Sequence, residues 1–182
     1  SRRRHTRFRN VTGVQTCALP ISARLGHEKR RDSVTILLTG GGGFVGLNIA
    51  EALLRQGQEL VMLDARSPPP YALTTLGKLP GKLTFIRTDV SDPDAVNAAF
   101  RQCRPRRVIH AAAITCGTER ESREYARVID VNIKGAANVL RAASESGVER
   151  FIYISSGSVY GETLREERPL TESHSAPVPD TL

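Results

Sequence analysis

Three glycines, Gly40, Gly43 and Gly46, have a spacing that suits a phosphate site made by the backbone. They follow an apolar run directly and open a segment whose apolar residues recur at helical spacing. In such a turn the first glycine allows a sharp change of direction, the second lets the backbone approach a pyrophosphate, and the third lets the helix pack close to the strand. The N-terminus of the helix then offers unpaired N–H groups and a partial positive charge. The alternative interpretation is a flexible glycine-rich loop. Gly41 lies between the spaced glycines and is interpreted as incidental to the motif.

An acidic residue, Asp64, ends the next apolar run, 24 positions after Gly40. At this place in a dinucleotide-binding unit a carboxylate accepts hydrogen bonds from the adenosine ribose hydroxyls, and it repels a 2′-phosphate. Together with the glycine turn, Asp64 therefore predicts NAD as the cofactor, with NADP less favoured. Arg66, two positions on, would favour a 2′-phosphate and opposes this preference. The alternative interpretation of Asp64 is a solvated acid at the end of a strand.

The elements that must position these residues alternate along the chain. Apolar runs predict strands over residues 34–38, 59–64, 83–87, 107–111 and 150–155. Periodic segments predict a helix between the glycine turn and Gly57, one from about Asp92 to Cys103 with Ser91 as its N-cap, and a long one from about Arg120 to Ser146. The prolines at 68–70 predict a loop.

This alternation predicts an α/β fold, a Rossmann-type doubly wound parallel sheet with helices on both faces. Residues from Gly161 onward are polar and rich in proline, with no periodic element. We therefore expect the sheet to be incomplete at the C-terminal end of the sequence.

Further motifs follow the predicted strands in a fixed order. They are Thr39-Gly40-Gly41-Gly42-Gly43-Phe44-Val45-Gly46, Asp89-Val90, Val108-Ile109-His110-Ala111-Ala112-Ala113, Asn132 with Gly135 and Asn138, and Ser155-Ser156-Gly157-Ser158-Val159-Tyr160-Gly161. In this order and spacing the chain resembles the extended short-chain dehydrogenase/reductase family, the NAD-dependent sugar epimerases and dehydratases, from about Val34 to Leu182. The resemblance implies that the cofactor is held by Gly40, Gly43, Phe44, Val45, Gly46, Asp64, Asp89, Val90, Ala111, Ala112, Ala113 and Asn132.

Each motif residue also has a purely structural interpretation. Asp89 matches the family's adenine-side acid but can simply cap the loop before the helix. Asn132 would bridge backbone near the active site, or it is a polar surface residue of a helix. His110 is interpreted as a packed strand-end histidine rather than a proton shuttle. Tyr160 resembles a packing and substrate-side residue, so no catalytic role is assigned to it.

Ser156 is the one catalytic residue that the resemblance implies. The family's catalytic serine or threonine stands four positions before the tyrosine of the VYG segment, and its hydroxyl binds the substrate oxygen whose proton moves during hydride transfer. The alternative is a strand-end serine that satisfies the backbone. The family's base, a tyrosine in YxxxK, is absent, because none of the four tyrosines is followed by lysine four positions later. We expect the parent protein to carry the catalytic Tyr and Lys and a substrate lobe beyond this sequence, and the fragment to be inactive.

The resemblance implies that the parent oxidises a hydroxyl of a sugar or nucleotide-sugar, leading to epimerisation, dehydration, decarboxylation or simple dehydrogenation. It also implies a homodimer through the long helix, which would leave Val128, Val139, Leu140 or their neighbours exposed in the fragment. A non-catalytic dinucleotide-binding sensor on the same fold is the alternative function. Ser156 favours the enzyme, since a sensor needs no hydroxyl there.

The first 21 residues carry most of the excess positive charge, which is +7 for the whole chain. They hold five arginines and no acid, and without them 21 basic residues face 19 acidic ones. Residues 1–7 and 11–21 resemble the translated index-side adapter of a short-read sequencing library. We therefore interpret 1–21 as non-native, expect it to be disordered, and interpret the sequence as a translated environmental read. A basic nucleic-acid arm or a targeting peptide is the alternative. Residues 22–33 are an extension of undetermined origin, and 34–182 form the predicted domain.

The remaining composition is ordinary for a soluble globular chain, and a reducing cytoplasm is the expected compartment. No apolar run approaches the roughly 18 residues that span a bilayer, and the domain is not basic enough to predict a nucleic-acid partner. Outside the first 21 residues the cysteines are Cys103 and Cys116, without a CxxC or histidine cluster. They predict neither a metal site nor a disulfide framework.

Overall fold

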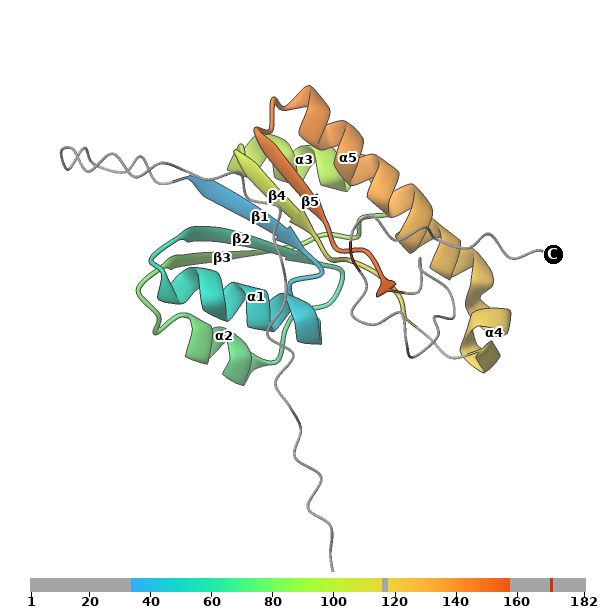
Figure 1. The fold of residues 1–182 in the computed structure, drawn as a ribbon, viewed down its shortest axis with the longest axis horizontal. Helices are drawn as coiled ribbons and strands as arrows, with labels where there is room; N and C mark the ends of the chain where they lie inside the picture. The colour runs from blue at the N-terminus through green and yellow to red at the C-terminus, as the bar shows by residue number, and fades with distance from the viewer. Residues whose placement is uncertain (1–33, 116–117, 158–170, 172–182) are drawn as a thin grey trace, which may run out of the picture. The chain divides into compact units, whose positions relative to one another are not determined.

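Five parallel strands form the centre of the fold (Figure 1). The computed structural model describes residues 34–115, 118–157 and 171. The strands are β1 (Thr35–Thr39), β2 (Glu59–Asp64), β3 (Lys82–Arg87), β4 (Arg107–His110) and β5 (Arg150–Tyr153). Their order in the sheet is β3-β2-β1-β4-β5, so the predicted doubly wound parallel sheet is confirmed. The order reverses between β1 and β4, and open α/β sheets bind ligands at such a switch point, outside the carboxyl ends of the strands.

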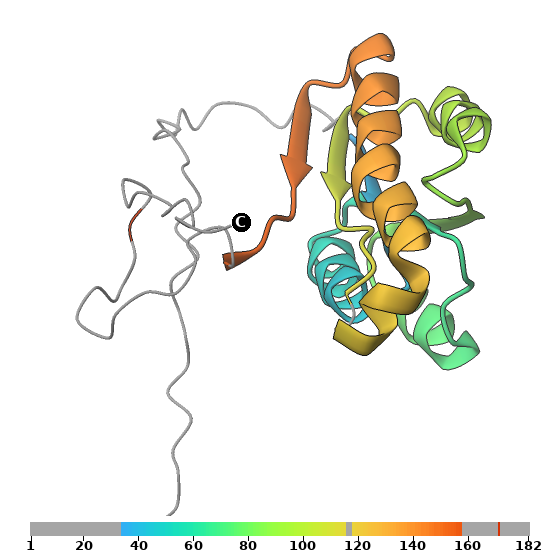
Figure 2. The same ribbon diagram turned by 90° about the vertical axis from the view of Figure 1, so that its right-hand side faces the viewer.

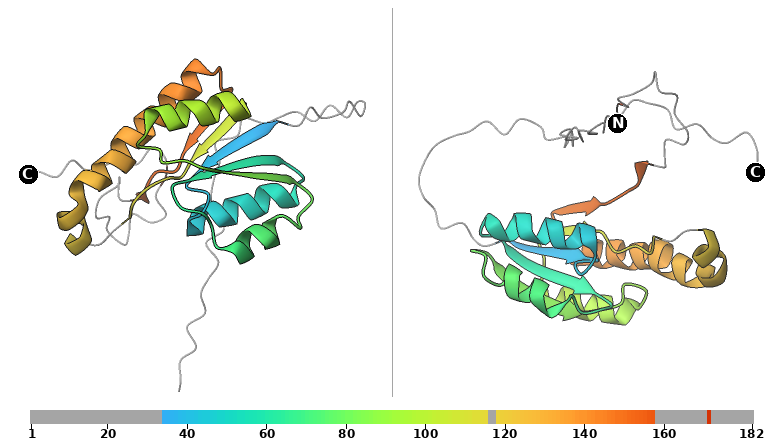
Figure 3. Two further views of the ribbon diagram at one scale, coloured as in Figure 1. Left: turned by 180° about the vertical axis from the view of Figure 1, so that it is seen from behind. Right: turned by 90° about the horizontal axis from the view of Figure 1, so that it is seen from below.

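Helices cover both faces of this sheet. They are α1 (Phe44–Arg55), α2 (Pro70–Leu76), α3 (Pro93–Cys103), α4 (Thr118–Ile129), the π-helix η1 (Asp130–Gly135) and α5 (Ala136–Glu145). Alternate residues of a strand face opposite sides: Ile36 and Leu38 of β1 pack with α1 and α2, whereas Leu37 packs with α3, η1 and α5. Helices α3 and α5 lie side by side on their face of the sheet (Figures 1 and 3).

Strand β5 is the edge of the sheet next to β4 (Figure 2). It pairs with β4 from Arg107 opposite Arg150 to His110 opposite Tyr153. No described strand pairs with its outer side, and Ile152, Tyr153 and the following Ile154 are exposed.

Two local predictions were wrong for reasons of backbone chemistry. The prolines at 68–70 do not all lie in a loop, because Pro70 is the first residue of α2. Proline is tolerated there, since the first turn of a helix makes no hydrogen bond through the N–H that proline lacks. The N-cap of α3 is Asp92 rather than Ser91, since the Asp92 carboxylate accepts the N–H groups of Asp94 at 3.0 Å and Ala95 at 3.1 Å.

The predicted long helix is not one regular α-helix. It begins at Thr118, has a kink at Glu124 with φ −116° and ψ 22°, and passes through the π-helix η1 before α5 ends at Glu145. Val131, Gly135 and Val139 form its buried face. The expectation that Val139 would be exposed is therefore wrong. Among the side chains of this run that the structure describes, the large apolar ones that are exposed are Tyr125, Ile129, Ile133 and Leu140.

The glycine turn is held by backbone approaches that leave no room for side chains. Gly40 has φ +68°, and a Cβ on it would lie 2.7 Å from backbone atoms of Ala111 and Ala112. A Cβ on Gly46 would lie 2.1 Å from the carbonyl oxygen of Gly40. The predicted roles of these glycines, a tight turn and close helix packing, are confirmed.

Gly41 is not incidental. A Cβ on this residue would lie 2.9 Å from Cβ of Met62 on the neighbouring strand β2. The N–H of Gly41 also donates to the carbonyl oxygen of Leu63 at 3.1 Å. The residue is small because the turn packs directly on β2.

A buried polar pair, Thr39 and His110, joins the ends of β1 and β4. The N–H groups of Ala111 and Ala112 both donate to Thr39 Oγ1 at 3.2 Å, so the Thr39 hydroxyl donates its own proton to His110 Nδ1 at 2.7 Å. The imidazole proton must then sit on Nε2, which has no partner among the described residues. His110 is 1% exposed and stacks on Phe151 and Tyr153. It is a packed strand-end histidine, as predicted.

Replacing Gly46 by alanine should destabilise the fold strongly, because its Cβ would collide with the Gly40 carbonyl oxygen. We expect Gly46→Ala to lower the free energy of unfolding by about 2 kcal/mol or more, measured by urea denaturation. Gly43→Ala is the matched control. Its Cβ would meet the same oxygen at 3.4 Å, an ordinary contact, and its φ of −79° suits alanine, so we expect a loss of about 1 kcal/mol or less. Equal losses in the two variants would contradict this account.

His110 should make stability depend on pH. Burial lowers the pKa of His110 to about 4 from 6.5. Between these values the unfolded chain binds a proton that the folded chain does not, so the free energy of unfolding rises with pH. The wild-type protein should lose up to about 3 kcal/mol from this residue as the pH falls from 6.5 to 4.

The matched variant is His110→Asn, which keeps an acceptor for the Thr39 hydroxyl and does not titrate. Urea denaturation across this pH range should show a shallower loss of stability in the variant. Parallel pH profiles would show that His110 does not carry the effect.

Candidate functional site

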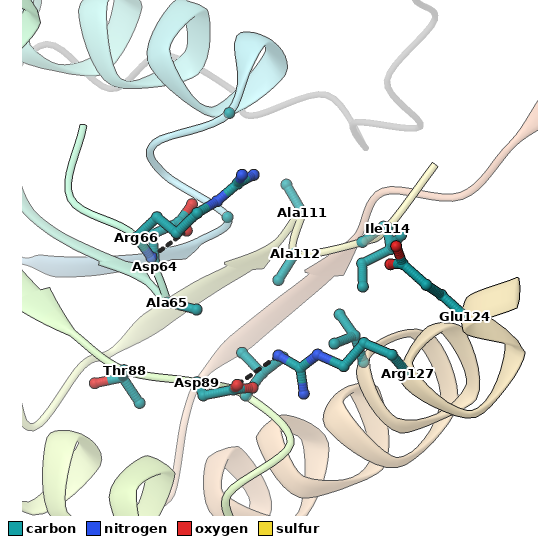
Figure 4. A pocket seen from close by; sticks show the side chains of 15 residues that line it. Asp64, Ala65, Arg66, Thr88, Asp89, Ala111, Ala112, Ile114, Glu124 and Arg127 are labelled. Atoms are coloured by element: carbon teal, nitrogen blue, oxygen red, sulfur yellow. Dashed lines mark hydrogen bonds and ion pairs between the residues drawn. The ribbon is translucent and has the colours of Figure 1, made fainter. Parts of the chain in front are cut away.

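A cavity of about 390 Å³ opens at the carboxyl ends of β1 to β4 (Figure 4). Its size lies in the range of small-molecule sites. Eight of the predicted cofactor residues line it: Gly40, Gly43, Asp64, Asp89, Val90, Ala111, Ala112 and Ala113. The structure therefore brings together residues from four separate motifs at the switch point of the sheet.

The other lining residues are not among the predicted cofactor residues, although the sequence already indicates that Arg66 would favour a 2′-phosphate. They are Ala65, Arg66, Thr88, Ile114, Glu124, Arg127 and Val131. Of the remaining predicted residues, Phe44, Val45, Gly46 and Asn132 do not line the cavity. The side chains of Phe44 and Val45 are exposed, so only their backbone is available to a ligand at the turn.

The N-terminus of α1 fits an anion. Gly43 is its N-cap, no side chain caps it, and the first turn holds no acidic residue. The first N–H groups of the helix therefore have no side-chain acceptor. Because a Cβ on Gly43 would meet only the Gly40 carbonyl oxygen, the space in front of this terminus is open. A pyrophosphate is the group that this combination of N–H groups and open space suits.

Asp64 is held beside the glycine turn rather than left in solvent. Its Oδ2 accepts the N–H of Gly42 at 3.0 Å, and its Oδ1 accepts the N–H of Arg66 at 3.0 Å. Each carboxylate oxygen keeps a further lone pair for a hydroxyl donor. Figure 4 shows Asp64 and Arg66 together on one side of the cavity.

Asp89, on the other side, takes part in a network that includes Arg127 of α4. Its Oδ1 accepts from both the N–H and the hydroxyl of Ser91, at 2.9 and 2.7 Å, and its Oδ2 accepts from Arg127 Nη2. Partial burial would raise the pKa of Asp89, but the hydrogen bonds from Ser91 and Arg127 and the charge of Arg127 together lower it. The interpretation of Asp89 as a loop cap is thus correct for its two hydrogen bonds from Ser91. It did not include the hydrogen bond from Arg127.

Two asparagines of the helical run fasten the loops that line the cavity. Asn132 Oδ1 accepts the N–H of Ile114 at 2.8 Å, and its Nδ2 donates to the carbonyl oxygen of the same residue at 3.0 Å. Asn138 Nδ2 donates to the carbonyl oxygen of Val90 at 3.0 Å. Asn132 therefore bridges backbone, as the resemblance implied, and is not a free surface residue.

Small residues complete this support. A Cβ on Gly135 would lie 2.6 Å from Cγ2 of Val90, so the π-helix packs directly against the loop after β3. The alanines at 111–113 keep side chains short where the loop after β4 borders the cavity. A π-helical turn inserted in an α-helical run, such as η1, occurs often at functional sites.

Ser156 does not join this cavity in the described structure. It is exposed, three residues beyond the end of β5, and it is not among the lining residues. Ser158 and Tyr160 lie outside the described residues. The catalytic assignment of Ser156 stays a prediction.

Within the described part of the chain, no group of three or more His, Cys, Asp or Glu side chains could hold a metal ion. Cys103 is partly buried, and burial raises the pKa of its thiol to about 11. Cys116 lies outside the described residues. No helix in the described ranges is both long and apolar enough to cross a membrane.

Curated proteins of known function are similar to this chain. The UDP-glucose 4-epimerase of Drosophila melanogaster is 30% identical over 148 residues, which are 77% of this chain and 41% of that protein. The 3-beta-hydroxysteroid dehydrogenase of Mycolicibacterium neoaurum is 36% identical over 133 residues, 71% of this chain and 34% of that protein.

Solved structures show the same fold. The Thermus thermophilus UDP-glucose 4-epimerase in complex with NAD has a TM-score of 0.67 and 32% identity, over 79% of this chain and 44% of that one. The Bifidobacterium longum UDP-glucose 4-epimerase in complex with NAD+ and UDP has a TM-score of 0.70 and 25% identity, over 79% of this chain and 43% of that one.

The chain thus spans less than half the length of each of these relatives. The family model for NAD dependent epimerases and dehydratases matches residues 36–181, from the first residues of β1 almost to the end of the sequence. That range includes the glycine turn, Asp64, Asp89, the alanines after β4 and Asn132. The chain belongs to the NAD dependent epimerase/dehydratase family.

Proposed function

We propose that this chain is the cofactor-binding part of an NAD-dependent oxidoreductase, epimerase or dehydratase that acts on a hydroxyl of a sugar or nucleotide-sugar. The observation that carries the proposal is the cavity at the switch point, where an uncapped helix N-terminus and the Asp64 carboxylate face one space. The solved relatives named above were obtained in complex with NAD.

The residues present fit NAD in a definite order along the sheet. The turn from Gly40 to Gly46, with the backbone of Phe44 and Val45, would hold the pyrophosphate. Asp64 would accept the adenosine ribose hydroxyls, and Asp89 with Val90 would lie on the side of the base. When bound, NAD supplies the hydride acceptor and donor.

The loop after β4 would face the other half of the cofactor. Ala111, Ala112 and Ala113 would let it pass close to the backbone, and Asn132 would keep this loop in place through Ile114. Ser156 would bind the oxygen of the reacting hydroxyl. It lies after β5, the strand adjacent to β4, at the carboxyl edge where the cavity opens.

The sugar class of substrate is supported by relatives. Besides the UDP-glucose 4-epimerases, a dTDP-L-rhamnose 4-epimerase of Burkholderia thailandensis is 34% identical over 72% of this chain. A steroid dehydrogenase is also similar over 71% of this chain, so we do not expect this part of the chain to set the substrate class. The substrate itself would be selected by residues outside this sequence.

The parent protein would be a homodimer through the helical run. Tyr125 and Ile129 of α4 are exposed and four residues apart, so they lie on one side of that helix. Ile133 of η1 and Leu140 of α5 are exposed farther along the run. Exposed apolar groups of this kind are typical of an interaction surface. Light scattering of the longer parent checks the dimer, and a monodisperse monomer would refute it.

The chain should prefer NAD to NADP, because the Asp64 carboxylate would confront a 2′-phosphate. We expect the dissociation constant for NADP to exceed that for NAD by about tenfold or more in a calorimetric titration. Asp64→Ala should narrow this gap, whereas Arg66→Ala should widen it. Equal or tighter NADP binding by the wild-type chain would show that Arg66 sets the preference, and absence of NAD binding would refute the proposed function.

The 182-residue chain should show no turnover, since it holds Ser156 but no tyrosine with a lysine four positions later. A positioned acid–base group contributes about 10²–10⁴ in rate. An assay of NAD reduction against a panel of sugars and nucleotide-sugars tests this expectation. The comparison is a version extended by a grafted YxxxK helix and substrate lobe. Turnover by the short chain that disappears in Ser156→Ala would contradict the expectation.

A further inference from the structure

Three polar side chains form a closed hydrogen-bonded ring beside the cavity, and two of them line it. Arg127 donates from Nη2 to Asp89 Oδ2 at 2.5 Å and from Nη1 to Ser91 Oγ at 2.8 Å. The Ser91 hydroxyl donates in turn to Asp89 Oδ1 at 2.7 Å. The ring therefore links α4 to the loop between β3 and α3, and both Asp89 and Arg127 line the cavity (Figure 4).

The position of this ring along the sheet defines which part of a dinucleotide it faces. The strand order places the carboxyl end of β1 next to β2, and that of β2 next to β3. The glycine turn follows β1, Asp64 ends β2, and Asp89 follows β3, with the N–H of Thr88 donating to the Asp64 carbonyl oxygen at 2.9 Å. With the pyrophosphate at the glycine turn and the ribose at Asp64, as proposed above, the base lies at Asp89.

The hydrogen-bonding capacity of Asp89 restricts the base that it accepts. An ionised carboxylate only accepts hydrogen bonds. Oδ1 already accepts two, both from Ser91, whereas Oδ2 accepts one from Arg127 and keeps one acceptor position. That position suits a donor such as the exocyclic amine of a purine and disfavours a carbonyl oxygen in the same place.

The pairing of Arg127 with Asp89 is better explained by orientation than by stability. The two side chains are 41% and 36% exposed, and ion pairs at such exposure contribute little to folding. The planar guanidinium contacts two different residues at once, which fixes the plane of the carboxylate. Without it, Asp89 would be held through Oδ1 only and Oδ2 would be free to turn.

We propose that Arg127 is a positioning residue for base recognition: by holding Asp89 Oδ2 it makes the site select a purine that carries an exocyclic amine. The proposal rests on the proposed function, since it concerns the adenine end of NAD. It is separate from the choice between NAD and NADP, because the 2′-phosphate would lie at Asp64 and Arg66.

The test compares two dinucleotides that differ only at the base. The 182-residue chain is titrated with NAD and with nicotinamide hypoxanthine dinucleotide, in which a carbonyl replaces the amine, and dissociation constants are measured by calorimetry. We expect the wild-type chain to prefer NAD by about tenfold, the effect of one charge-assisted hydrogen bond. Arg127→Met keeps the aliphatic stem and should reduce this preference to about twofold, through weaker NAD binding with unchanged binding of the analogue.

Two further variants sharpen the test. Arg127→Lys keeps the charge but not the two-pronged contact, so its preference should stay well below the wild-type value. Arg55→Met is the matched control, because it removes an exposed arginine–carboxylate pair of α1, Nη2 to Glu51 Oε1 at 2.6 Å, away from the cavity lining. It should leave both dissociation constants unchanged.

The outcomes separate this proposal from the function on which it rests. Equal weakening of both ligands in Arg127→Met, or a full preference in Arg127→Lys, would overturn the positioning role while NAD binding stands. A wild-type chain without preference between the two dinucleotides would also overturn it. A wild-type chain that binds neither ligand would refute the proposed function together with this inference.

Discussion

The close contact between the end of β1 and the end of β4 determines the geometry of the site. The backbone of Gly40 approaches Ala111 and Ala112 so closely that no Cβ fits, and the Thr39 hydroxyl accepts two N–H groups of the same loop. A cavity exists at this point because the chain leaves the two strands in opposite directions across the sheet. Its shape is set by backbone approaches rather than by large side chains. The helix N-terminus, the Asp64 carboxylate and the alanines are all positioned relative to this junction.

On the opposite side of the cavity, two side-chain amides hold the loops in place. Asn132 and Asn138 each use a short, rigid side chain to satisfy backbone groups of a loop, which a helix cannot do with its own N–H and C=O groups. The π-helix between α4 and α5 lies where Gly135 packs on Val90. The loop after β3 and the loop after β4, which both border the cavity, are therefore held from the same helical run.

Much of the fold was predictable because its signals are local. The strand at Glu59–Asp64 was predicted with its observed ends, and the glycine turn and Asp64 stand where the spacing placed them. Errors arose where two local signals compete. Pro70 both prevents a strand and begins a helix, and adjacent Ser91 and Asp92 are both good caps, of which the aspartate caps α3 while the serine binds Asp89. The contact of Arg127 with Asp89, 38 positions apart, has no local signal at all. It arises only because the folded chain brings α4 beside the loop after β3.

The Thr39–His110 hydrogen bond joins residues 71 positions apart in the chain. Strands β1 and β2, by contrast, pair across a single helical connection, and β2 and β3 do so as well. Closing the loop between β1 and β4 therefore costs more conformational entropy than closing the loops between β1 and β2 or between β2 and β3. Parallel pairing between strands far apart in the chain is also slow to form. We infer that β1, β2 and β3 associate first and that the junction closes late in folding. The cavity is then absent from partly folded forms in which β4 has not yet joined β1, so a ligand that binds there stabilises only forms of the chain in which this junction is closed.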